Sequence, residues 1–141
     1  MSYTYADYTF IDYAIVNGTT TTQLAGNRAS GVPRHFTRVG LRTEPYKRIA
    51  IDVYHTISIG LFANDANTQY VDGWNVSNVC GSFSAELRGM GIAPFVGVNN
   101  VFNNAYVGTV TINGAFNRTL RPAPLRNYYV GGEVSFRLPV R

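Results

Sequence analysis

Hydrophobic and polar side chains alternate one by one along most of this chain. The clearest stretch is Tyr128 to Leu138. Apolar residues such as Val134 and Phe136 occupy every second position there, and polar residues such as Glu133 and Ser135 lie between them. A period of two residues predicts a β-strand with one apolar side and one polar side.

About six segments show this pattern or a weaker form of it, and sustained helical spacing of apolar residues is absent from the sequence. The predicted strands are Tyr3 to Ile15, His35 to Thr43, Ile49 to Gly60, Trp74 to Phe83, Gly91 to Phe102, and Tyr128 to Leu138. We therefore expect an all-β fold in which helices are short or absent.

The connections between the predicted strands alternate between long and short. The long ones are Val16 to Arg34, Phe62 to Gly73 and Asn103 to Asn127, and the short ones are about Glu44 to Lys47 and Ala85 to Met90. Outer-membrane barrels have tight turns at one rim and long loops at the other. Soluble sheets usually keep most connections short. The alternation favours an antiparallel, up-and-down barrel or part of one.

Composition limits the number of domains and the class of partner. The chain has 141 residues, of which 45% are hydrophobic and 14% charged, and its net charge is +4. These values predict one ordered domain over residues 1–141. The cations are scattered along the chain, so we do not expect nucleic-acid binding. The start of the chain shows no signal-peptide pattern, and no apolar run is long enough for a membrane helix.

Metal and nucleophile chemistry have few candidate residues here. Cys80 is the single cysteine, and His35 and His55 are the two histidines, so we expect no disulfide framework, no metal site and no cofactor. Asp52 and His55 lie three residues apart in a predicted strand and therefore point to opposite faces. Cys80 has no C-x-x-C partner and is expected to be a small buried residue. We expect no catalytic residues and no enzyme.

Two groups of side chains have both a functional and an ordinary interpretation. Arg34, Arg38 and Arg42 share one strand face, which would line a barrel interior or simply be solvated, and Lys47 and Arg48 follow them. A set of tyrosines would form an aromatic girdle at a membrane interface or ordinary cross-strand pairs. The tyrosines are Tyr3, Tyr5, Tyr8, Tyr13, Tyr128 and Tyr129.

Three motifs resemble one family. The stretch from Asn27 to His35 reads N-x-x-x-G-V-P-R-H, and the stretch from Val98 to Tyr106 matches V-x-N-[LV]-F-[DN]-x-x-Y. A P-x-x-x-R element, Pro122 to Arg126, leads into the closing strand. In order and spacing these motifs resemble the late barrel strands of TonB-dependent outer-membrane receptors. The resemblance implies the last strands of a barrel of about 22 strands, a transport-related or pore role, and the outer membrane of a Gram-negative bacterium.

An isolated sheet of this size has two open edges, whereas outer-membrane barrels start at about eight strands. The chain would therefore pair with the remainder of a larger barrel or with copies of itself, in contact with lipid. The alternative is a small soluble barrel that turns its apolar face inward around a small apolar ligand. Its core would be Ile49, Ile51, Val53, Ile57, Ile59, Val130, Val134 and Phe136. The sequence points to no ligand-binding residue.

Overall fold

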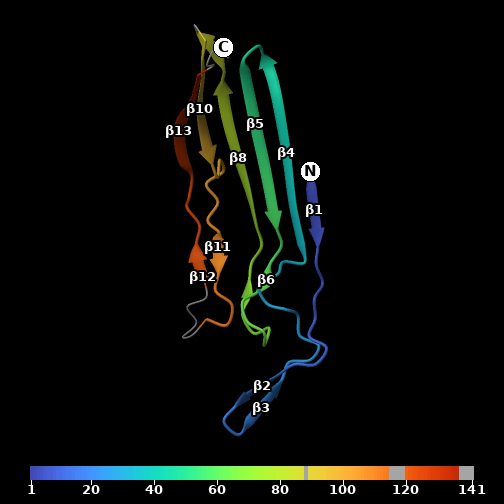
Figure 1. Ribbon diagram of the computed structural model, residues 1–141. Coiled ribbons are helices and arrows are strands. Elements are labelled where there is room, and N and C mark those ends of the chain that lie inside the picture. Colours follow the sequence, from blue (N-terminus) through green and yellow to red (C-terminus); the bar gives the residue numbers. More distant parts are fainter. Residues whose placement is uncertain (88, 115–119, 137–141) are drawn as a thin grey trace, which may run out of the picture.

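The computed structural model describes residues 1–87, 89–114 and 120–136, and its main feature is one antiparallel, seven-stranded sheet (Figure 1). The strands follow the order β1-β4-β5-β8-β10-β13, and β9 pairs with β10. Their bounds are Ser2–Tyr5 (β1), His35–Tyr46 (β4), Ile49–Ser58 (β5), Trp74–Phe83 (β8), Ala85–Leu87 (β9), Met90–Asn99 (β10) and Asn127–Phe136 (β13). Each long strand pairs with the next one along the chain, so the connectivity is up-and-down.

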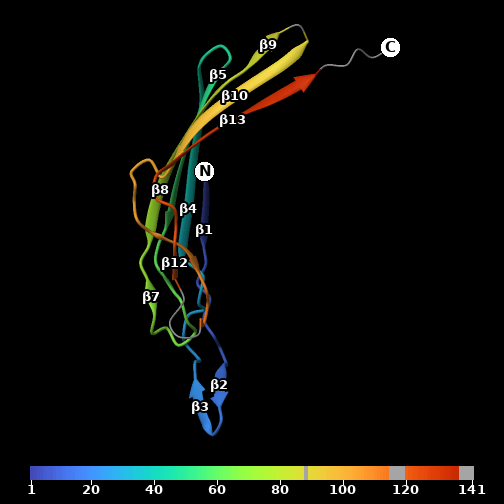
Figure 2. The same cartoon turned by 90° about the vertical axis from the view of Figure 1, so that its left-hand side faces the viewer.

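The sheet is curled, as the second view makes plain. In Figure 2 the upper parts of β10 and β13 swing away from β4 and β5. The strands contain many β-branched and aromatic residues, which favour a pleated backbone. Among the described residues none is helical, and no segment there forms a helix long and apolar enough to cross a membrane. The predicted all-β, antiparallel fold is therefore confirmed.

The two ends of the sheet differ as the connection lengths predict. At the upper end in Figure 1, a tight turn joins β4 to β5, and β10 begins three residues after β9 ends. The long connections lie at the other end, and each contains a small hairpin. The hairpins pair Ala14–Asn17 (β2) with Thr20–Gln23 (β3), Leu61–Phe62 (β6) with Tyr70–Val71 (β7), and Val107–Val110 (β11) with Leu120–Pro122 (β12). We call these two ends the turn end and the loop end.

The first predicted strand is wrong for most of its length. Only Ser2–Tyr5 joins the sheet, against His35–Arg38. Beyond it the chain continues in irregular pairing, with Phe10 N–H donating to Asn27 C=O at 2.9 Å. The later part, Ala14–Asn17, belongs to the separate β2–β3 hairpin. Apolar residues recur through this stretch, but its first part pairs with β4 and its last part pairs with β3. The alternation alone does not reveal this division.

Other predicted boundaries shift by a few residues. The predicted turn Ala85 to Met90 is too long, because Ala85–Leu87 forms β9 and pairs with β10. The strand predicted to reach Phe102 ends at Asn99. Positions 137 and 138 of the predicted closing strand lie outside the described residues.

The register assigns the strand residues to two faces, because directly paired residues project to the same side of a sheet. The apolar face carries Tyr3, Val39, Leu41, Ile51, Val53, His55, Ile57, Val79, Val96, Val98, Tyr128, Val130, Val134 and Phe136. The polar face carries Arg38, Arg42, Asp52, Tyr54, Thr56, Asn78, Cys80, Gly97, Tyr129, Glu133 and Ser135.

The apolar face is open, not packed into a core. Val130 is 82% exposed, Phe136 72% and Leu41 64%. The soluble-barrel alternative needs this face inside, but β1 and β13 do not pair with each other. Its proposed core residues Ile49, Ile57, Ile59, Val130, Val134 and Phe136 are all exposed. The sheet therefore presents a broad apolar surface of the kind that marks a contact with lipid or protein.

Candidate functional site: the polar face and the loop end

Ion pairing on the polar face joins β4 to β5. Arg42 and Asp52 are register partners, and the Arg42 guanidinium donates to both carboxylate oxygens of Asp52, at 3.2 and 2.9 Å. Arg38 lies on the same face, 5.1 Å from the centre of the Tyr54 ring. This arrangement places two cations on the side that would line a barrel interior. Lys47 and Arg48 are separate from them, in the turn between β4 and β5.

Three glycines on this face lie beneath aromatic rings of the neighbouring strand. The Tyr54 ring covers Gly40, the Tyr129 ring covers Gly97, and the Phe95 ring covers Gly131; in each case a Cβ would overlap the ring. Glycine within a strand marks such close approaches. The rings therefore lie flat along the sheet and cover the glycine backbone.

Gly97→Val tests this packing. A branched side chain at position 97 would occupy the space of the Tyr129 ring, so we expect a loss of about 1–3 kcal/mol in unfolding free energy. Urea titration followed by the fluorescence of Trp74, the single tryptophan, measures it. Tyr129→Ala in the same chain removes the clash, so the double variant should be more stable than Gly97→Val alone. Additive losses from the two substitutions would contradict this account.

The tyrosines predicted to form a girdle do not all lie on one face. Tyr3 and Tyr5 surround His35 at the loop end of the apolar face, where the Tyr3 hydroxyl and His35 Nδ1 are 2.7 Å apart. Tyr128 shares that face, whereas Tyr129 lies on the polar face, opposite Gly97. Tyr8 and Tyr13 lie outside the strands of the main sheet. Tyr129 is therefore excluded from a girdle by its orientation.

The residues considered for catalysis are divided between the two faces. Asp52 and Cys80 are register partners on the polar face, whereas His55 projects from the apolar face and lies 2.7 Å from Ser77 Oγ through Nδ1. Cys80 is partly exposed, so the expectation that it is buried is wrong. Among the described residues, no group of three His, Cys, Asp or Glu side chains could hold a metal ion.

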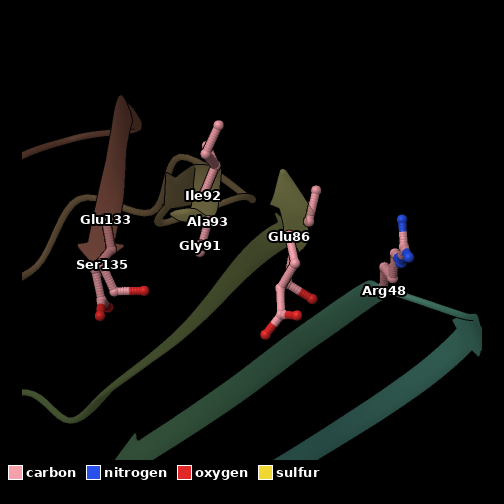
Figure 3. A pocket seen from close by; sticks show the side chains of 9 residues that line it. Arg48, Glu86, Gly91, Ile92, Ala93, Glu133 and Ser135 are labelled. Atoms are coloured by element: carbon pink, nitrogen blue, oxygen red, sulfur yellow. The ribbon is translucent and has the colours of Figure 1, made fainter. Parts of the chain in front are cut away.

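A shallow cavity of about 390 Å³ lies at the turn end. Glu86 of β9 and Glu133 and Ser135 of β13 point into the same space, while Arg48 lies apart from them on the β4–β5 turn (Figure 3). Carboxylates from two strands and the Arg48 side chain line it, so this part of the polar face carries charges of both signs.

Asn100 organises the loop end where β10 stops. It has a left-handed backbone, φ 53°, and is 1% exposed. Its side-chain amide donates to Asn104 C=O at 2.8 Å, and its Oδ1 accepts from Asn104 N–H at 2.9 Å. Asparagine adopts the left-handed region more readily than other residues with a side chain. This explains why the motif from Val98 to Tyr106 has an asparagine at this point.

The motif from Asn27 to His35 is fixed by charge and by close packing. Arg34 donates to Asp7 at 2.8 Å, and this hydrogen bond lowers the pKa of the Asp7 carboxyl below its ordinary value of 3.8. Arg28 Nε lies 3.6 Å from the same carboxylate. Gly31 has φ 76°, and a Cβ there would overlap the Ile112 side chain. The bonds to Asp7 attach the start of β4 to the residues that follow β1, and the close packing at Gly31 brings Ile112 of the third connection against the motif.

An aromatic cluster lies on the polar side near the loop end. Trp74 packs against Tyr106 with ring centres 4.8 Å apart and meets the edge of Phe36 at 6.5 Å. Phe36 is the second residue of β4, Trp74 begins β8, and Tyr106 precedes β11. The sequence analysis missed this cluster, since its residues are distant along the chain and alternation alone does not bring them together.

Solved structures share this arrangement of strands. BauA, the ferric preacinetobactin receptor from Acinetobacter baumannii, matches with a TM-score of 0.65 and 18% identity over 79% of this chain and 16% of that one. FecA, a ferric citrate transporter in its unliganded form, matches with a TM-score of 0.69 and 17% identity over 79% of this chain and 18% of that one. PiuA, a siderophore receptor from Acinetobacter baumannii, matches with a TM-score of 0.70 and 14% identity over 87% of this chain and 17% of that one.

The sheet has the fold of a segment of these receptors. The resemblance based on the three motifs is thus confirmed for the fold. No family model matches the sequence. The chain spans 16% to 18% of the length of the three structures, so it corresponds to one segment of a much larger barrel.

Proposed function

We propose that this chain is the C-terminal part of a transport-related β-barrel in the outer membrane of a Gram-negative bacterium. Its apolar face would lie against lipid, and its polar face would line the interior. The observation that carries the proposal is the separation of the faces: Val130 and Phe136 project to one side, and Arg42, Asp52 and Glu133 to the other. Lipid-facing and interior residues alternate in this way along membrane strands.

The open edges support a partner that completes the barrel. Among the described strands, β13 pairs with β10 alone, and β1 covers His35–Arg38 of β4. No described strand pairs with the same edge of β4 along Val39–Tyr46. Unpaired backbone groups in lipid cost several kcal/mol each, so both edges require further strands. The remainder of a larger barrel would supply them; edge-to-edge pairing with further copies of this chain is the second way of closing the sheet.

The same orientation supports a role in transport. The receptors with this fold take ferric preacinetobactin, ferric citrate or siderophores, as their names state. Here the polar face would contribute charged and aromatic side chains to the wall of a passage, with no catalytic step. Because Asp52 pairs with Arg42, Arg38 is the group here that would attract an anionic solute.

Spin labels on the two faces test the proposal. Val130→Cys is made together with Cys80→Ser, so that the only label lies on the apolar face, and the unaltered chain carries its label at Cys80 on the polar face. In lipid vesicles we expect the label at position 130 to collide with dissolved oxygen and the label at Cys80 to meet a water-soluble nickel chelate instead. If the chelate reaches position 130 as readily as position 80, the apolar face is not in lipid.

Light scattering after size exclusion, with and without detergent, distinguishes pairing with copies of this chain from pairing with the remainder of a larger barrel. A discrete multimer in detergent would support closure by copies of the chain. A monomer in detergent that aggregates without it would support pairing with other strands. A stable monomer of 15.5 kDa in plain buffer would contradict the membrane proposal.

A further inference from the structure

The three long connections meet at one short segment of the second connection, residues 62–67. Gly31 N–H of the first connection donates to Phe62 C=O at 2.8 Å, and Asn113 N–H of the third donates to Ala63 C=O at 3.0 Å. The first and third connections are thus held by adjacent carbonyl groups, although they are about 80 residues apart in sequence, from 31 to 113.

Asp65 supplies side-chain bonds to the same two connections. Its Oδ1 accepts from Ser30 Oγ at 2.5 Å, and its Oδ2 accepts from the Asn113 amide at 2.8 Å. Its backbone N–H donates to Asn113 Oδ1 at 3.1 Å, and its C=O accepts from the Asn27 amide at 3.0 Å. The residue is 9% exposed. We call Asp65, Ser30, Asn113 and Asn27 the Asp65 cluster.

Asn67 adds a second link to the first connection. Its Oδ1 accepts from Arg28 N–H at 2.7 Å, and its amide donates to Arg28 C=O at 2.8 Å. This pair of bonds imitates the pairing of two strands with a side chain in place of one backbone. The first and second connections are thereby joined at three points, through residues 62, 65 and 67.

We infer that the parts of the three long connections around residues 27–31, 62–67 and 113 open and close as one cooperative unit, with Asp65 as its centre. Each bond of a buried carboxylate to a polar hydrogen stabilises by more than a neutral bond does. Because one side chain supplies bonds to both neighbours, loosening either connection removes stabilisation from the other. Contiguous segments that share such bonds commonly open together. The consequence is that a ligand or partner that displaces one connection at the loop end would displace all three.

Hydrogen exchange at two amides is the direct test. The amides of Gly31 and Asn113 are the reporters, since each donates to a carbonyl of the second connection. In the full chain in detergent micelles, Asp65→Ala should raise the exchange rate at both by about tenfold or more, which corresponds to the loss of one charged hydrogen bond. Amides in the middle of β5 should not change.

Two further variants keep the test decisive. Asp72→Ala removes an exposed carboxylate from the same connection and should leave both reporters unchanged. Ser30→Ala removes one bond from the first connection alone, and cooperativity requires that it also accelerate exchange at the Asn113 amide. If Ser30→Ala affects only Gly31, or if Asp65→Ala loosens the second connection alone, the three connections move independently and the inference is overturned.

Discussion

Val79→Arg is expected to destabilise the protein in a lipid bilayer by about 2–4 kcal/mol, the cost of a cation on the lipid face near the midplane of a membrane barrel. Val79 lies in the middle of β8 and projects to the apolar face, paired with Val53 on one side and Val98 on the other. The side chains directly across from it, Val53 and Val98, offer no acceptor for the guanidinium.

The neighbouring position provides the matched control. Cys80 lies at the same depth on the opposite face, directly across from Asp52. Cys80→Arg would place its charge on the polar side beside a carboxylate, so we expect a loss of about 1 kcal/mol or less. Urea unfolding of the chain in vesicles, followed by Trp74 fluorescence, compares the two variants. Equal losses at 79 and 80 would mean that neither face is in lipid, which would contradict the proposed function.

The sheet could be predicted because its two faces meet different surroundings. A strand with one apolar and one polar face must alternate, and this alternation is plain in Ile49–Ser58 and Asn127–Phe136. The lengths of the connections then give the up-and-down order, because a tight turn such as that at Arg48, φ 73°, forces neighbouring strands to pair. Both signals are local, so they can be found in a single sequence.

The arrangement of the loop end could not be predicted in this way. Ser30, Asp65 and Asn113 belong to three different connections, and nothing in their spacing shows that they touch. Each polar residue in a loop satisfies the same compositional rule whether it bonds a distant side chain or water. The motif residues carried more information: Asn27 and Asn100 both make bonds that fix a loop. The resemblance found these positions, but their contacts required the structure.

The difference between local and distant contacts also explains why the predicted first strand, Tyr3 to Ile15, was wrong for most of its length. Tyr3 and Tyr5 pair with β4, whereas the backbones of Phe10 and Tyr13 bond to Asn27 and Leu24 of the first connection. The soluble-barrel alternative was wrong about burial in a similar way, because it placed in a core apolar residues that are exposed in the sheet. Periodicity shows which residues share a face, but it does not show whether that face is covered by protein or by lipid.

Asn100→Ala should have the second large effect, a loss of about 2–4 kcal/mol in unfolding free energy. The substitution removes the two hydrogen bonds from the Asn100 side chain to the backbone of Asn104. The N–H and C=O of Asn104 then lack those partners. It also places alanine at φ 53°, in the left-handed region, which costs roughly 1–2 kcal/mol for a residue with a Cβ. Urea titration in micelles, again with Trp74 fluorescence, measures the loss.

A series at this one position separates the two causes. Asn100→Gly adopts the left-handed backbone freely but makes no side-chain bond, so its loss should be smaller than that of alanine by about 1 kcal/mol. Asn100→Asp keeps the acceptor for Asn104 N–H but turns a buried carboxylate oxygen toward Asn104 C=O in place of the amide donor, so its loss should exceed that of glycine. The expected order of stability is therefore asparagine, then glycine, then alanine. If glycine restores the full stability, the backbone conformation alone selects the residue, and the bonds to Asn104 contribute nothing to the end of β10.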